Sequence, residues 1–162
     1  MNNISIIVAM DRQRGIGLNG RIPWRLQNDM SHFKNVTKGR VVVMGRKTYE
    51  SLPEKVRPLP DRVNLILTRN KSFKAPGCKV TTFDDVLNIA VHQEIYIIGG
   101  EEIYNMFIGE SDRLLITHVE TIVHGDRFFP HVEGKWNSRI LHQHDADERN
   151  EFPFTIIEYK RK

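Results

Sequence analysis

Cysteine is almost absent from this sequence of 162 residues, which contains only Cys78. A single cysteine cannot form an intramolecular disulfide, so we expect an apolar core to stabilise the chain in a reducing compartment, the cytoplasm. Long hydrophobic runs are also lacking. The largely apolar run at residues 4–10 is too short to span a bilayer and has no basic leader before it. The sequence therefore predicts neither a secreted disulfide scaffold nor a membrane protein.

A strong charge of either sign is missing as well. The net charge is only +4 and the isoelectric point is about 9.3, which is compatible with phosphate-bearing cofactors, carboxylate substrates or nucleic acids as partners. The basic residues are scattered and do not alternate with aromatic ones, so nucleic-acid binding is disfavoured. The chain contains no linker, repeat or low-complexity tract, and residues 1–162 are expected to form one domain.

Short runs rich in valine and isoleucine recur along the chain and alternate with amphipathic segments. The runs are typical of strands buried on both faces and lie at residues 4–10, 41–44, 65–67, 95–98 and 114–116. The amphipathic segments predict helices near residues 26–36, 46–52, 84–91 and 101–108. This alternation predicts an α/β fold with a mostly parallel central sheet.

The last third of the chain has a different pattern. No helix is expected between the segments 114–120, 138–144 and 153–159, which indicates antiparallel strands at the C-terminus. The prediction is therefore a mixed sheet of about eight strands flanked by about four helices. Open sheets of this class bind ligands beyond the carboxyl ends of their strands.

Residues 15–20, Gly-Ile-Gly-Leu-Asn-Gly, match the dinucleotide-binding pattern G-x-G-x-x-G but not its context. Four residues separate the motif from the preceding strand, and Pro23 and Trp24 follow where a helix should begin. The motif instead predicts a glycine-rich surface loop. Because glycine tolerates the dihedral changes of opening and closing, such a loop could serve as a lid.

Basic residues follow two of the expected strands. Arg46, Lys47 and Thr48 come after Gly45, and Thr68 and Arg69 come after the strand at residues 65–67. Two strand ends with this chemistry favour a phosphate-rich ligand over solvated surface charge. A third strand ends in Gly99 and Gly100, which permit close backbone approach, whereas the next two residues, Glu101 and Glu102, would repel a phosphate and are expected to serve the start of a helix.

A metal site is not expected. His142 and His144 would share one face of a strand near Asp145 and Asp147, but a hydrated polar strand end is the better interpretation. The sequence has no Ser, His and Asp grouping typical of a nucleophile, and nothing marks Cys78 as reactive.

Asp29 is the most unusual position. Leu26, Met30, Phe33 and Val36 recur at helical spacing and form an apolar stripe that includes this carboxylate. Burying an unpaired carboxylate is costly and raises its pKa unless a cation or a hydrogen-bond donor stabilises the charge. Periodicity alone leaves two interpretations open: a charge at the edge of the stripe that reaches solvent, or a functional carboxylate in a cleft.

Taken together, these segments resemble the dihydrofolate reductase family over nearly the whole chain. The resemblance depends on the order and spacing of Ile16-Gly17, Ile22-Pro23-Trp24-Arg25-Leu26, Asp29 with Phe33, residues 43–51, Arg57-Pro58-Leu59-Pro60 with Arg62, Ile98-Gly99-Gly100 with Tyr104, Thr117-His118, and Gly125-Asp126 with Phe129-Pro130. Aspartate at position 29 resembles the bacterial branch, because vertebrate members carry glutamate there.

The resemblance implies transfer of a hydride from C4 of NADPH to C6 of 7,8-dihydrofolate, with protonation at N5, to give tetrahydrofolate for one-carbon metabolism. Asp29 would bind N3 and the 2-amino group of the pterin, and Thr117 would hydrogen-bond that carboxylate. Arg62 would bind the α-carboxylate of the glutamate tail. The implied catalytic set also contains Ile22 and Trp24, and the remaining substrate-binding residues would be Ile7, Val8, Met30, Phe33, Leu52, Leu59, Ile98 and Tyr104.

On the cofactor side, the resemblance implies that Arg46, Thr68 and Arg69 bind the 2′-phosphate of NADPH. Lys47 and Thr48 would bind the pyrophosphate. The other cofactor-binding positions would be Ala9, Ile16, Gly17, Gly45, Ser51, Gly99, Gly100 and Tyr104. Residues 15–24 would be the lid, stabilised by Asp126. The resemblance also implies a monomer that binds diaminopyrimidine and pteridine antifolates, with no metal, nucleic acid or membrane partner.

Two other functions are weighed against this one. A reductase of the same fold acting on another nitrogen heterocycle would lack the pair Asp29 and Thr117, and a basic nucleic-acid-binding module would not oxidise NADPH. The chain departs from the family pattern at three places: residues 52–57 look longer than usual, Asp61 stands in place of glycine, and Arg127 stands in place of threonine. The first departure concerns the residues expected to contact the benzoyl ring, the second concerns the binding of the glutamate tail by Arg62, and the third concerns how Asp126 stabilises the lid.

Overall fold

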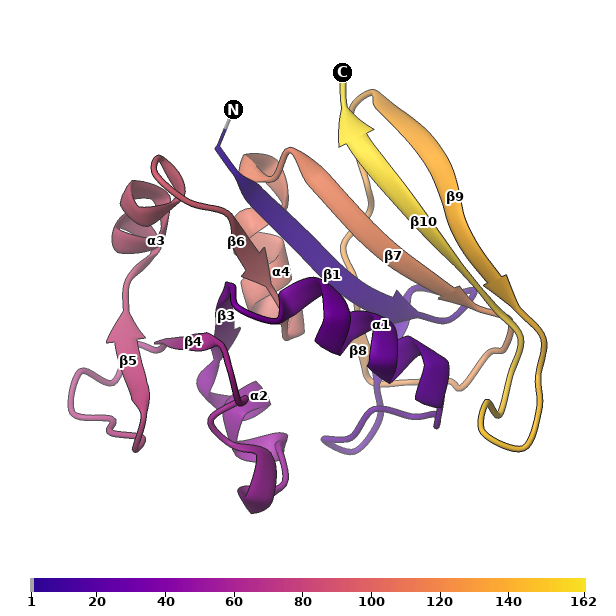
Figure 1. Ribbon diagram of the computed structural model, residues 1–162, viewed down its shortest axis with the longest axis horizontal. Helices are drawn as coiled ribbons and strands as arrows, with labels where there is room; N and C mark the ends of the chain where they lie inside the picture. The colour runs from indigo at the N-terminus through magenta and orange to yellow at the C-terminus, as the bar shows by residue number, and fades with distance from the viewer. Residues whose placement is uncertain (1) are drawn as a thin grey trace.

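The computed structural model describes residues 2–162 and is built on one eight-stranded sheet with the strand order β5-β4-β3-β6-β1-β7-β10-β9 (Figure 1). The strands of this sheet are β1 (Ile4–Met10), β3 (Val41–Gly45), β4 (Val63–Leu67), β5 (Cys78–Thr81), β6 (Ile95–Ile97), β7 (Arg113–Val119), β9 (Trp136–His144) and β10 (Phe154–Arg161). A separate two-stranded ribbon pairs β2 (Gly15–Gly17) with β8 (Arg127–Phe128).

The helices are α1 (Gln27–Thr37), α2 (Arg46–Ser51), α3 (Phe83–Ala90) and α4 (Glu101–Phe107), with short 3-10 turns η1 (Glu54–Val56) and η2 (Ile108–Glu110). The six strands from β5 to β7 are mutually parallel, whereas β10 is antiparallel to β7 and to β9. The expected α/β fold, with a mostly parallel sheet and antiparallel C-terminal strands, is confirmed.

Two apolar cores lie on opposite faces of the sheet. Alternate residues of β1 contribute to each: Ile6 packs on the face covered by α3 and α4, and Ile7 packs on the face that includes Phe33 of α1 and Tyr49 of α2. In Figure 1, α1 crosses in front of the sheet and α4 lies behind it. Because both faces of the sheet are covered, a central strand such as β1 carries apolar residues at nearly every position. Burying each such isoleucine stabilises the fold by roughly 1.5–3 kcal/mol.

Helix α1 begins one residue later than the sequence predicted, at Gln27, because Leu26 has extended backbone dihedrals. The side chain of Leu26 is only 2% exposed and packs against Val119, Phe154 and Ile156. Within the helix only Thr37 is fully buried, and Met30 is 57% exposed. The apolar stripe of α1 is therefore only partly buried: Phe33 and Val36 pack against the core on this face, whereas Met30 is exposed.

Three strands were not predicted. β5 is a partly exposed edge strand, and β2 and β8 are short and pair across more than a hundred residues. Among residues 2–162, no helix is both long and apolar enough to cross a membrane.

Candidate active site

The carboxyl ends of the parallel strands bring the predicted site residues to one edge of the sheet. β3 ends at Gly45, β6 is followed by Gly99, and β7 carries Thr117 near its end. The strand ends are tied together, since the N–H of Gly45 donates to the carbonyl of Gly99 at 2.9 Å. This edge is where the sequence predicted a phosphate site.

Asp29 projects from the first turn of α1 toward β7. The hydroxyl of Thr117 donates to Asp29 Oδ1 at 2.6 Å and joins residues that are 88 positions apart. Burial raises the pKa of Asp29 to about 6, and the hydrogen bond from Thr117 offsets this shift only in part. Because no salt bridge among the described residues involves Asp29, its carboxylate has unused acceptor capacity for a ligand with N–H donors.

The start of α1 is held by a turn near the C-terminus that the sequence did not identify. Asn150 is fully buried, and its Oδ1 accepts the N–H of Asn28 at 3.0 Å, while the N–H of Gln27 donates to the carbonyl of Arg149. No side chain of the preceding residue caps this helix, so the distant amide takes that role. Asn150 thereby fixes the turn that carries Asp29.

The walls beside Asp29 are apolar and end at a cation. Phe33 and Leu52 are half-buried, Leu59 is buried, and the Arg62 guanidinium lies 5.9 Å from the centre of the Phe33 ring. Arg62 donates to Thr37 Oγ1 at 3.2 Å and to the carbonyl of Pro60 at 2.8 Å, which fixes its direction. A flat apolar ligand with a terminal carboxylate would complement this surface.

On the far side of β1, the Tyr104 hydroxyl donates to the carbonyl of Ile7 at 2.9 Å. Burial, together with the charge of Asp29, raises the pKa of Tyr104, so the phenol stays protonated. Val8, the next residue of β1, is buried, and Ile98, which directly follows the neighbouring strand β6, is half-buried. Of these predicted substrate-binding positions, Tyr104 is close enough to Asp29 to feel its charge, whereas Val8 packs in the core on the α3 and α4 face.

The glycines after β6 allow the backbone to approach a ligand closely. Gly99 has φ of +121°, a conformation that strongly favours glycine, and a side chain there would also meet the Tyr104 ring. A side chain at Gly100 would meet the hydroxyl of Thr48 at 3.4 Å, so the ends of β3 and β6 lie against each other. Lys47 is exposed beside them. These features fit an elongated phosphate-bearing cofactor.

The two arginines predicted to bind a phosphate are paired with glutamates. Arg46 lies 2.7 Å from Glu50, and Arg69 lies 2.9 Å from Glu102 across the strand ends. All four side chains are well exposed, so these ion pairs are weak and a phosphate can replace the carboxylates. Glu101 does not cap α4 with its side chain, because its Oε2 accepts the N–H of Phe128 in β8 at 2.6 Å.

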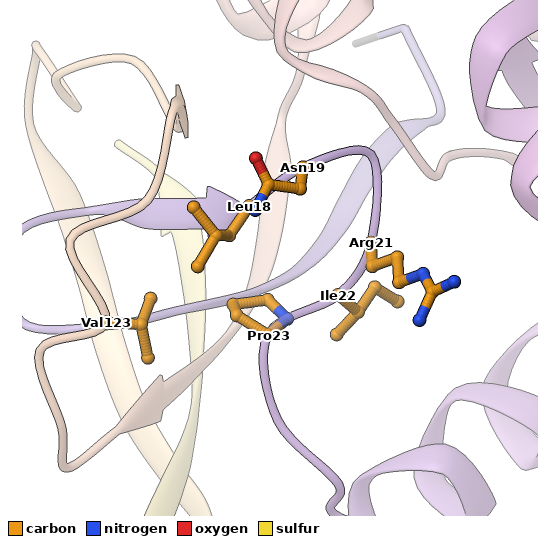
Figure 2. A pocket seen from close by; sticks show the side chains of 6 residues that line it. All are labelled: Leu18, Asn19, Arg21, Ile22, Pro23 and Val123. Carbon is orange, nitrogen blue, oxygen red and sulfur yellow. The ribbon is translucent and has the colours of Figure 1, made fainter.

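The loop predicted to be a lid starts in β2, which pairs with β8. The N–H of Asn19 donates to Asp126 Oδ2 at 3.1 Å, and the N–H of Asp126 donates to the carbonyl of Gly17 at 2.9 Å. A hollow of about 580 Å³ lies beside this loop and is lined by Leu18, Asn19, Arg21, Ile22, Pro23 and Val123. Figure 2 shows these six side chains.

The other predicted positions are spread over several elements. Ile22 is 65% exposed at the hollow, whereas Trp24 and Ala9 pack beside Leu26. Ile16 packs against the core on the α4 face, Ser51 donates to the carbonyl of Thr48, and Thr68 Oγ1 accepts the N–H of Asn70.

The four residues considered as metal ligands do not assemble into a metal site. The rings of His142 and His144 are 5.8 Å apart, and His144 Nε2 lies 3.7 Å from Asp147. Across residues 2–162, no group of three or more His, Cys, Asp or Glu side chains is placed to hold a metal ion.

Comparison with known proteins agrees with this arrangement. The family model described as dihydrofolate reductase matches residues 3–161. The chain is 38% identical over 162 residues to the dihydrofolate reductase of Bacillus subtilis, covering 98% of this chain and 95% of that relative. It is 37% identical over 161 residues to the Staphylococcus aureus enzyme, covering 98% of each chain.

A solved structure is also similar along its whole length. Described as dihydrofolate reductase from Enterococcus faecalis complexed with NADP(H) and RAB-propyl, it superposes with a TM-score of 0.90 at 31% identity, covering 100% of this chain and 98% of the other. Sequence and structure lead to the same conclusion: this chain belongs to the dihydrofolate reductase family.

Proposed function

We propose that this chain reduces 7,8-dihydrofolate to 5,6,7,8-tetrahydrofolate with NADPH as the hydride donor. Family membership supports this reaction. The structural observation that supports it most directly is the hydrogen bond from the Thr117 hydroxyl to Asp29, next to the apolar side chain of Phe33. When bound, NADPH supplies the hydride that C6 of the pterin receives. A reductase of another heterocycle would have no need for this pair of a carboxylate and a hydroxyl group.

Asp29 is proposed to bind and orient the substrate. Its carboxylate can accept hydrogen bonds from N3 and the 2-amino group of a pterin, while Thr117 holds one of its oxygens. A pKa of about 6 leaves most of the carboxylate ionised at neutral pH, and its negative charge favours a protonated, more electrophilic substrate. Because a carboxylate bound at N3 lies too far from N5, water is proposed to deliver the proton.

The apolar wall and the arginine are proposed to place the rest of the substrate. Met30, Phe33 and Leu52 would enclose the pterin and benzoyl rings, and Arg62 would bind the tail carboxylate. Filling this space excludes water and fixes the reacting rings face to face, which is the main contribution the protein makes to a hydride transfer. Antifolates with a diaminopyrimidine or pteridine ring are expected to bind Asp29 in the same way.

The cofactor site is proposed to consist of Gly45, Lys47 and Thr48 on one strand end, Gly99 and Gly100 on the next, and the cations Arg46 and Arg69 at the 2′-phosphate. Charge-assisted hydrogen bonds to that extra phosphate would select NADPH over NADH. Replacing Arg46 and Arg69 together by glutamine should raise the KM for NADPH about tenfold or more while leaving that for NADH nearly unchanged. An equal effect on both cofactors would contradict this assignment.

The direct test is to mix the purified protein with dihydrofolate and NADPH and to follow the loss of the reduced nicotinamide absorbance. NADH serves as the cofactor control, and Asp29→Asn serves as the site control. We expect the substitution to cut turnover by orders of magnitude while the Kd for NADPH stays nearly the same. No consumption of either cofactor by the parent protein would refute the function. Action as a cytoplasmic monomer remains a prediction, which sedimentation and cell fractionation can test.

A further inference from the structure

Asp11 is a buried carboxylate that the reaction described above does not use. It follows β1 directly and is only 3% exposed. Its Oδ1 accepts the backbone N–H groups of Gln13 at 2.8 Å and Gly15 at 2.7 Å, and its Oδ2 accepts the N–H of Val123 at 2.9 Å. A carboxylate that accepts three backbone hydrogen bonds holds the segments that donate them firmly in place, because hydrogen bonds to a charged acceptor are about twice as strong as neutral ones.

The three donors belong to two segments that are far apart in the chain. Gln13 and Gly15 form the turn into β2, from which the lid starts, whereas Val123 lies between β7 and β8. Val123 is also one wall of the hollow beside the lid, together with Leu18 and Pro23 (Figure 2). A single side chain therefore joins the root of the lid to the wall against which the lid rests.

The presence of glycine at position 15 follows from the same contact. A side chain at Gly15 would meet the two oxygens of Asp11 at 2.9 and 3.0 Å, closer than Cβ atoms normally approach other atoms. The turn is closed by a hydrogen bond from the N–H of Asp11 to the carbonyl of Gly15. The first glycine of the motif at residues 15–20 thus makes room for a carboxylate and not for a dinucleotide.

We propose that Asp11 is a positioning residue of the reductase, which fixes the root of the lid to the segment around Val123; this role rests on the proposed function. It differs from the contact made by Asp126, which holds the lid further along, at Asn19. Asp11 is enclosed by its own backbone partners and acts only through them. Without it, only backbone hydrogen bonds, such as the one from the N–H of Arg12 to the carbonyl of Thr121 at 3.1 Å, join the lid root to this segment, and the looser lid encloses the reacting rings less well.

The test uses Asp11→Asn, which keeps one acceptor oxygen but places an amide NH2 against a backbone N–H. We expect the single-turnover rate of hydride transfer to fall about tenfold, because small misplacements at the reacting centre have effects of this size, while the Kd for dihydrofolate changes less than about twofold. Amide hydrogen exchange in the ligand-free protein should show lost protection at Gly15 and Val123. The matched control is Thr82→Ala, which removes a hydroxyl that accepts the N–H of Asp85 at the start of α3 and should change neither measurement.

A second variant keeps the proposal testable if Asp11→Asn folds poorly. Gly15→Ala displaces the carboxylate from the other side, so it should slow hydride transfer in the parent but add little in the Asp11→Asn background. Hydride transfer within twofold of the parent in both single variants would overturn the proposal, and so would lost protection without slower transfer, which indicates a structural role only. A parent protein that transfers no hydride would instead refute the function itself.

Discussion

Replacing Asp29 by asparagine should stabilise the ligand-free protein although it should cut turnover by orders of magnitude. Burial raises the pKa of Asp29 from an ordinary 3.8 to about 6, with the Thr117 hydroxyl opposing this shift. Above about pH 6 the carboxylate is ionised in both the folded and the unfolded chain, and the folded state bears the full cost of the buried charge. Below the ordinary pKa of 3.8 both states are protonated and that cost disappears.

The magnitude follows from the two pKa values. The folded protein binds more protons than the unfolded chain between pH 3.8 and about 6, so this contribution to stability falls as the pH rises through that window and costs about 3 kcal/mol above it. Asparagine still offers an oxygen to Thr117 but brings an amide that is also costly to bury. We therefore expect a net gain of about 1–2 kcal/mol at pH 8 and less than about 1 kcal/mol at pH 4.

Urea unfolding of the parent and of Asp29→Asn at the two pH values measures this difference. The matched control is Asp147→Asn, because hydrogen bonds from the Asn150 side chain and from backbone N–H groups lower the pKa of that exposed carboxylate. Its replacement should destabilise the protein at pH 8, with the opposite sign to Asp29→Asn. A change in unfolding free energy that is equal at both pH values, or a loss at pH 8 for Asp29→Asn, would refute the reasoning.

Three further predictions concern packing, the lid and the tail site. Leu26→Ala should lower the unfolding free energy by about 2–4 kcal/mol in urea, whereas Met30→Ala, at an exposed position, should leave it within about 0.5 kcal/mol and instead raise the KM for dihydrofolate. Gly125→Ala places a Cβ against the carbonyl of Gly17, so β2 and β8 must separate and stopped-flow hydride transfer should slow about tenfold; an unchanged rate would show that the backbone absorbs the methyl group. Asp61→Gly removes a carboxylate beside Arg62 and should lower the KM for dihydrofolate, and an unchanged or higher KM would show that Asp61 does not compete for the guanidinium.

The strands that could be predicted are those whose side chains are buried on both faces. β1 and β3 read as continuous apolar runs, because the sheet gives them no polar side. β5 could not be predicted in this way, because it is an edge strand in which Lys79 and Val80 are exposed, so its sequence is not an apolar run. β2 and β8 carry no local signal at all, because each is defined only by pairing with a distant segment.

The candidate site was predictable to different extents in its different parts. Asp29 stands out as a charge on an apolar stripe, but its partner Thr117 follows only from the family resemblance, since no helical or strand period relates residues 88 positions apart. The pairing of Arg46 with Glu50 could have been recognised from the i,i+4 spacing on a helix. Asn150 and Asp11 lie in loops, where polar residues are common. Each has a hydrogen-bond partner that is distant in the sequence and becomes visible only in the folded structure.

The central place of β1 in the sheet also determines when the protein can assemble. β1 is the first strand to be synthesised, yet its neighbours are β6 and β7, so it has no partner until residues 95–97 and 113–118 have followed. Until then the apolar segment of β1 has neither of its partner strands, and such unpaired apolar segments are prone to aggregation. Such long-range pairing makes folding slow. The contact between Asp29 and Thr117 therefore forms late, when most of the polypeptide has already been made.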